Sequence, residues 1–110
     1  MKQLNPDHVA ALRAHVNNCP YFSLISMKID ALEMGRSILE MEIQEKHLQP
    51  YGIVHGGVYS SLIDAAAFWA AYSTVEGTSG MTTVEMKLNY LAPAASGRFI
   101  ARGKSIKTGK

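Results

Sequence analysis

The sequence predicts an α+β fold, in which a curved antiparallel sheet wraps around one central helix. Residues 58–75 form an apolar run rich in alanine, the strongest helix former. Segments on both sides of this run alternate apolar and polar residues with the period of a half-buried strand. Strands gathered around one apolar helix, without a repeating strand–helix pattern, favour α+β over α/β.

Length and composition indicate one domain over residues 1–110, with an N-terminal helix within residues 1–19. The chain has 110 residues, of which 47% are hydrophobic and 18% charged, so it can fill a core and is not a disordered tail. A domain this short buries a modest share of its surface. We therefore expect a homo-oligomer, either a dimer or a dimer of dimers (a homotetramer).

The charge and cysteine content exclude several classes of function. A net charge of +2 is too small to indicate nucleic acid, and the lone Cys19 excludes an internal disulfide or a cysteine-rich zinc site. The N-terminus lacks an apolar leader, and no apolar stretch approaches the roughly 20 residues that span a bilayer. We expect a cytoplasmic protein with no membrane or nucleic-acid partner and no metal or other cofactor.

The first predicted helix begins at Asn5-Pro6-Asp7. Asn5 can cap the first amides, Pro6 suits the first turn and Asp7 complements the helix dipole. Asn17-Asn18-Cys19-Pro20 ends the helix, because the residue before a proline avoids the helical conformation.

A β-hairpin with one solvent-exposed face is predicted next. Ile25, Met27 and Ile29 alternate with polar residues, and so do Leu39, Met41 and Ile43. Residues 33–36 supply the turn between the two strands.

Residues 47–53 are predicted to form a loop, and the apolar run then forms a buried helix of about five turns. It is apolar nearly all round, so we expect the sheet to wrap it, and Gly77 and Gly80 to end it. Two further strands are predicted at residues 81–91 and 98–106.

Asp64 is the only residue with a formal charge between His47 and Val75. Burying a carboxylate is costly, so its presence in an apolar helix needs a reason. One reading is a general base or nucleophile in an apolar pocket. The alternative is a structural carboxylate that caps a backbone group or pairs with Lys or Arg.

His55-Gly56-Gly57 stands where the loop becomes the helix. The first helix amides have no partner within the helix and the dipole is positive there, so this turn suits a developing oxyanion. The alternative is an ordinary N-cap loop with a hydrogen-bonded histidine.

The spacing of Gly57 and Asp64 leads to a prediction about assembly. Seven residues are two helical turns, about 10 Å along the axis, so one acyl carbonyl cannot touch both groups of one helix. If both act on one carbonyl, they come from two copies, which predicts a two-fold dimer with sites at its interface.

Three runs of residues carry a family resemblance. They are Gln49-Pro50-Tyr51-Gly52-Ile53-Val54-His55-Gly56-Gly57, Leu62-Ile63-Asp64, and Val84-Glu85-Met86-Lys87-Leu88-Asn89-Tyr90-Leu91-Ala92-Pro93. Together they resemble hotdog-fold acyl-CoA thioesterases of the phenylacetate-pathway (PaaI-like) type, over most of the chain from about Tyr21 onward. The resemblance implies a curved sheet around the helix and hydrolysis of an acyl- or aroyl-CoA to free acid and coenzyme A.

The resemblance also implies roles for individual residues. Asp64 corresponds to the carboxylate that attacks the thioester or activates water, and the Gly57 amide to the oxyanion donor. His55 orients the thioester, and Gln49 holds the water or the carbonyl. Thr82 or Thr83 corresponds to a hydroxyl residue of the opposing subunit, and Thr83 is preferred because it shares a face with Glu85 and Asn89. The substrate-binding residues expected in addition are Gly56, Thr82, Phe68 and Asn89. Ala65, Phe68, Trp69 and Tyr72 are candidates for acyl-pocket walls, or for simple core.

The chain is shorter at its C-terminus than this family, whose later strands lie inside the sheet. Unpaired strand edges and a partly unwrapped helix are therefore expected. The basic residues after Glu85 could hold the phosphates of coenzyme A or form solvated strand faces. Two other functions stay open: a non-catalytic acyl-CoA-binding or incomplete hotdog protein, and a hotdog enoyl-thioester hydratase or dehydratase.

Overall fold

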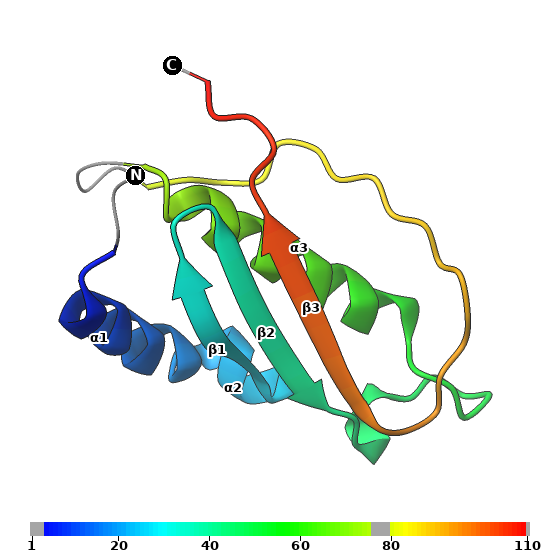
Figure 1. Cartoon of the computed structure of the whole chain (residues 1–110). Coiled ribbons are helices and arrows are strands. Elements are labelled where there is room, and N and C mark those ends of the chain that lie inside the picture. Colours follow the sequence, from blue (N-terminus) through cyan, green and yellow to red (C-terminus); the bar gives the residue numbers. More distant parts are fainter. Residues whose placement is uncertain (1–3, 76–79, 110) are drawn as a thin grey trace.

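A computed structural model describes residues 4–75 and 80–109 of the chain (Figure 1). Three strands form an antiparallel sheet in the order β1-β2-β3, and the long helix α3 lies across one face. Helices α1 and α2 lie beside β1. The elements are α1 (Pro6–Asn17), α2 (Pro20–Ile25), β1 (Met27–Glu33), β2 (Arg36–Glu42), the 3-10 turn η1 (Glu45–His47), α3 (Gly56–Tyr72) and β3 (Arg98–Lys104).

Helix α1 begins and ends as predicted. The Asn5 side chain accepts hydrogen bonds from the amides of Asp7 and His8, and the helix stops at Asn17. The Asn17 side chain then accepts from the Ile29 amide at 2.8 Å and donates to the Ile29 carbonyl at 3.2 Å. It thereby covers part of the outer edge of β1 with hydrogen bonds that a further strand would otherwise make.

Helix α2 corrects the prediction that Ile25 opens a strand. Pro20 occupies its first turn, and the left-handed Ser26 (φ 58°) turns the chain from the helix into β1. The alternation of apolar and polar residues wrongly predicted a strand here. A helix of six residues is too short for the helical period of 3.6 residues to become visible in the sequence.

The predicted hairpin is confirmed as β1 and β2, joined by a turn at Met34-Gly35. Ile29, Leu39 and Met41 are fully buried on the face of the sheet toward the core. On the opposite face Glu40 forms ion pairs with Lys28 and Arg98. The helix end is fastened to this turn by Ser73, whose hydroxyl donates to the Ala70 carbonyl and accepts from the Gly35 amide, both at 2.7 Å.

Helix α3 starts at Gly56, as the sequence indicates, but ends at Tyr72, before Gly80; Gly77 lies outside the described residues. The helix approaches β3 very closely at Gly103. A Cβ on Gly103 would lie 2.1 Å from the Ala66 carbonyl oxygen, so only glycine fits there.

The prediction of a strand at residues 81–91 is wrong for this structure. The chain is extended from residue 80 to 94 but joins no sheet. Its alternating side chains would bury one face only if a neighbouring strand paired with it. On the predicted apolar face, Val84 is instead 95% exposed and Tyr90 59% exposed. The predicted strand at 98–106 is confirmed as the shorter β3.

The expectation that the sheet wraps the whole of α3 is met on one face only. Leu62, Ala66 and Ala70 are buried against the sheet, whereas Ile63 and Ala67 are exposed. One apolar side of the helix therefore remains uncovered by the described residues.

Candidate active site

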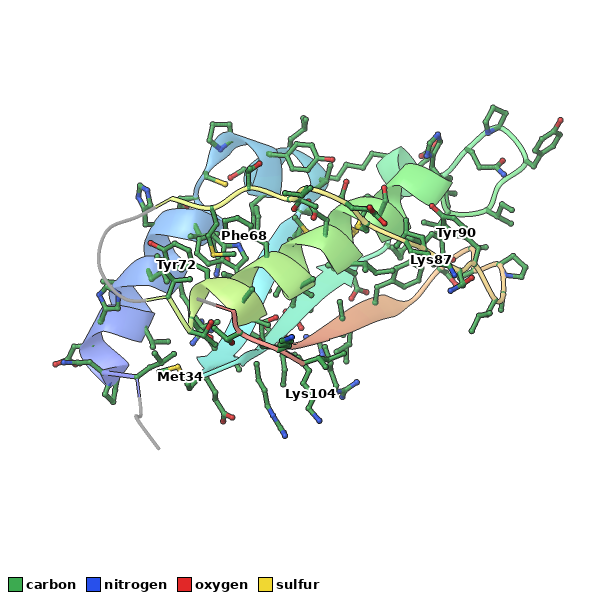
Figure 2. The ribbon with its side chains drawn as sticks, turned by 90° about the horizontal axis from the view of Figure 1, so that it is seen from above. Met34, Phe68, Tyr72, Lys87, Tyr90 and Lys104 are labelled. Atoms are coloured by element: carbon green, nitrogen blue, oxygen red, sulfur yellow. The ribbon has the colours of Figure 1, made fainter. Side chains whose placement is uncertain are left out.

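Asp64 lies on α3. The extended segment 80–94 passes over this helix (Figure 2). The Thr83 hydroxyl donates a hydrogen bond of 2.6 Å to Oδ1 of Asp64. The carboxylate is half-buried, not deeply buried as the sequence suggested. No ion pair of the described residues involves Asp64, so the expected alternative of pairing with Lys or Arg finds no support among them.

The hydroxyl comes from the same chain. The family resemblance had implied that it would be supplied by an opposing subunit, and the structure differs because segment 80–94 folds back across its own α3.

A hollow of about 440 Å³ adjoins Asp64. Its walls are largely apolar, and they come from α2, α3, the start of β1 and the extended segment. Figure 2 shows Phe68 projecting from α3 beneath that segment. The lining residues are Tyr21, Phe22, Met27, Ser60, Ser61, Asp64, Ala65, Phe68, Trp69 and Met86.

Three of the expected wall residues, Ala65, Phe68 and Trp69, line this hollow, and Tyr72 does not. Tyr72 instead stacks on Phe68, with 6.0 Å between the two ring centres. An apolar chamber that carries one carboxylate can accept an acyl group and expose its carbonyl to a base.

Sequence reasoning missed the contribution of α2. Tyr21 and Phe22 both line the hollow, and the Tyr21 hydroxyl lies 2.5 Å from the Ser61 hydroxyl on α3. The signal was Pro20, which favours the first turn of a helix and would have placed two aromatic residues side by side on it.

The start of α3 is organised by His55, its N-cap residue. Nδ1 of His55 accepts the Gly57 amide at 2.8 Å. This amide, which the sequence predicts as the oxyanion donor, is therefore engaged in the structure. His55 thus has the role that the sequence offered as the alternative, a hydrogen-bonded histidine at the N-cap.

Gly56 is covered by an aromatic side chain. The Tyr90 hydroxyl donates to the Gly56 carbonyl at 3.2 Å, and a Cβ on Gly56 would lie 3.6 Å from the tyrosine ring. Tyr90 also packs edge-to-face on Tyr59, at 5.7 Å between ring centres. The tyrosine thus stands over the helix start that the sequence assigns to substrate.

The remaining predicted residues are not gathered around Asp64. Oε1 of Gln49 accepts the Tyr51 amide within its own loop. Thr82 and Asn89 are exposed on the extended segment, and no hydrogen bond among the described residues uses their side chains. The structure therefore brings together Asp64, Thr83 and Phe68, while Gly57 lies two turns away along the regular helix α3.

Over residues 4–75 and 80–109, no group of three or more His, Cys, Asp or Glu side chains could hold a metal ion. None of the helices in these ranges is both long and apolar enough to cross a membrane.

Residues 51–110 match the family model of the thioesterase superfamily. A 1,4-dihydroxy-2-naphthoyl-CoA hydrolase of Listeria monocytogenes is 33% identical over 86 residues, which are 78% of this chain and 70% of that protein. Human acyl-coenzyme A thioesterase 13 is 32% identical over 69% of this chain and 54% of its own length. The chain therefore belongs to the thioesterase superfamily.

Solved structures extend this result to the fold. A thioesterase family protein from Silicibacter pomeroyi is 34% identical, with a TM-score of 0.82 over 89% of this chain and 72% of that one. A Haemophilus influenzae thioesterase, 23% identical, shares the fold with a TM-score of 0.83 over 99% of this chain and 73% of its own. The architecture is the hotdog thioesterase fold. The chain spans 62% and 59% of the lengths of two Saccharolobus solfataricus relatives.

Proposed function

We propose that the protein hydrolyses an acyl- or aroyl-CoA thioester to the free acid and coenzyme A. The observation that carries the proposal is Asp64, a carboxylate held by Thr83 at the wall of an apolar hollow. Membership of the thioesterase superfamily supports the same reaction. A thioester is already activated, so its hydrolysis needs a base or nucleophile, an oxyanion donor and a dry acyl pocket.

In the proposed reaction the acyl group enters the hollow beside Phe68, and its carbonyl carbon comes within reach of Asp64. Thr83 occupies Oδ1, so Oδ2 is left to accept a proton from the attacking water. The water oxygen bonds to the carbonyl carbon, the carbon–sulfur bond breaks, and the proton passes to the leaving thiolate. Direct attack by the carboxylate, followed by hydrolysis of the anhydride, gives the same products.

The Gly57 amide is the proposed oxyanion donor, at the positive end of the helix dipole. It must first leave Nδ1 of His55, so substrate has to displace or turn the imidazole. We assign His55 to orienting the thioester and Gln49 to holding the water or carbonyl. Substrate contacts are assigned to Gly56, Thr82, Phe68 and Asn89.

The distance between Gly57 and Asp64 supports a shared site. Two turns of α3 separate them, so the amide and the carboxylate that meet on one carbonyl belong to two copies of the chain. We therefore propose a homodimer in which each site combines Asp64 and Thr83 of one copy with Gly57 of the other.

Binding of acyl-CoA without hydrolysis is a second candidate. The engagement of the Gly57 amide by His55 favours it, because a chain with no available oxyanion donor would bind the thioester and leave it intact.

A panel of acyl- and aroyl-CoA thioesters tests the proposal, with release of free thiol as the readout. We expect Asp64→Asn to lower kcat by at least about 100-fold, as loss of a general base does. Asp7→Asn, which removes an acid from the exposed first turn of α1, serves as the matched control. Equal rates for wild type and Asp64→Asn would remove Asp64 from the mechanism. Binding without thiol release would support the second candidate.

A further inference from the structure

His47 is a buried polar residue, 2% exposed, that takes no direct part in the proposed reaction. Nδ1 of its imidazole accepts the Gln44 amide at 2.8 Å, and Nε2 lies 2.6 Å from the Ile25 carbonyl oxygen. An amide can only donate and a carbonyl can only accept, so these two partners assign the neutral imidazole with its proton on Nε2. Each ring nitrogen is therefore satisfied by a different segment of the chain.

The hydrogen bond from Nε2 holds the end of α2. Ile25 is the last residue of this helix, which has only six residues and therefore few backbone hydrogen bonds of its own. Helix α2 carries Tyr21 and Phe22, which line the hollow beside Asp64. The imidazole thus fixes the helix that forms one wall of the proposed acyl pocket.

The hydrogen bond to Nδ1 holds the turn that leads to the proposed oxyanion donor. By accepting the amide of Gln44, the N-cap residue of η1, the imidazole closes this turn. The backbone carbonyl of His47 then accepts the His55 amide at 2.9 Å. His55 is the N-cap of α3 and holds the Gly57 amide. The imidazole therefore acts on the start of α3 through the turn.

We propose that His47 is a positioning residue for thioester hydrolysis, a role that rests on the function proposed above. Nε2 sets the wall formed by α2, and Nδ1 sets the turn that presents Gly57. In the proposed dimer the wall belongs to the site with Asp64 of the same chain, and the turn serves the site of the other copy. A neutral imidazole suits this role because it offers one donor and one acceptor on a rigid ring.

Two substitutions separate the two hydrogen bonds. Glutamine places its amide nitrogen near the position of Nε2, so His47→Gln keeps a donor for the Ile25 carbonyl. Asparagine places its oxygen near the position of Nδ1, so His47→Asn keeps an acceptor for the Gln44 amide.

We expect His47→Gln to lower kcat about fivefold or more with KM nearly unchanged, because the oxyanion turn is loosened and the acyl wall is not. His47→Asn should raise KM by a similar factor with kcat nearly unchanged. Thiol release from the best thioester of the panel measures both constants. Glu45→Gln, exposed on the same turn, is the matched control and should leave them unchanged.

Hydrogen exchange supplies a readout that requires no turnover. His47→Gln should speed exchange of the His55 amide and leave the amides of α2 protected, whereas His47→Asn should do the reverse. Circular dichroism verifies that each variant folds.

A general loss of stability would affect both variants alike. Parallel changes of kcat and KM in the two variants, or exchange patterns that do not separate, would therefore overturn the positioning role and leave the thioesterase proposal standing. Unfolding of both variants would overturn it too, because the ring would then serve the fold as a whole. If the wild type released no thiol from any thioester, the proposed function would fail, and the exchange patterns would still decide whether His47 fixes the two segments separately.

Discussion

Thr83 is the residue through which the extended segment reaches the candidate base. Its hydroxyl donates to one carboxylate oxygen of Asp64, which fixes the rotamer of the carboxylate and leaves the second oxygen for water. A hydrogen bond to a charged group contributes about 1.5–3 kcal/mol. At this scale the proposed function depends on one hydrogen bond, between Thr83 and Asp64, which joins segments far apart in the sequence.

Replacing Thr83 with Val should therefore lower kcat by about tenfold or more, with a smaller effect on KM, because the carboxylate loses its positioning partner. Thr83→Ser keeps the hydroxyl and should retain most of the activity. Steady-state kinetics on the best thioester of the panel measures both. If Val and Ser behaved alike, the hydroxyl would have no part in positioning Asp64.

Gly103 is required by packing. Its missing side chain lets β3 approach the Ala66 carbonyl, which also accepts the Ser37 hydroxyl at 2.6 Å. Gly103→Ala should lower the free energy of unfolding by about 3 kcal/mol, at the upper end of overpacking effects, because the obstacle is backbone. Chemical denaturation measures the loss. Gly109→Ala, where nothing lies within 4 Å of the new Cβ, is the control and should be nearly neutral.

The charged face of the sheet predicts a dependence of stability on pH. Glu40 pairs with Lys28 at 3.1 Å and Arg98 at 2.8 Å, linking all three strands. The hydrogen bond from Lys28 is the largest effect on Glu40 and lowers its pKa. Partial burial is the largest effect on Asp30 and raises its pKa, and the nearby Glu40 raises it further.

These two shifts act in opposite directions. The stabilisation from Glu40 is present above its unfolded pKa and is lost as the pH falls through the lowered folded pKa. Asp30 favours the folded state in acid, and that contribution is lost as the pH rises through its raised pKa. Glu40→Gln should thus destabilise the protein near neutrality and much less in acid, whereas Asp30→Asn should stabilise it near neutrality. Urea unfolding at both pH values checks this, and a loss for Glu40→Gln that does not change with pH would contradict it.

At the scale of elements, the sequence predicts a boundary best where neighbouring residues alone determine it. The cap at Asn5, the hairpin turn at Gly35 and the glycine pair that opens α3 all depend on residues within a few positions of one another. These boundaries are confirmed in the structure. The identity of Asp64 as a partly buried charge on an apolar helix is likewise readable from the sequence.

The predictions from the sequence failed where the structure of a segment depends on a partner distant in the sequence. Residues 81–91 have the alternation of a strand, yet strand formation requires a neighbouring edge, and no local pattern encodes one. Helix α2 was missed because its single turn and a half is too short for periodicity. The hydrogen bond from the Gly57 amide to His55 could not be predicted from residue spacing. A helix N-cap and an oxyanion site have the same residues at the same positions, so the sequence does not distinguish them.

At the scale of the whole molecule, the proposed active site requires two chains. Asp64 and Thr83 lie together in one copy, but the oxyanion donor they need is two turns away along the same rigid helix. A single chain could therefore offer the thioester carbonyl either the carboxylate or the oxyanion donor, but not both. Symmetric pairing of two copies would complete two sites at once.

Mixing two inactive variants tests this central claim most directly. Asp64→Asn removes the base, and Gly57→Pro removes the amide at a first-turn position where proline is tolerated. Each variant alone should be inactive, and an equimolar mixture after subunit exchange should recover about a quarter of the wild-type thiol release, because half the dimers are mixed and each holds one intact site. A mixture as inactive as its components, or full activity in a strictly monomeric wild type, would contradict the shared site.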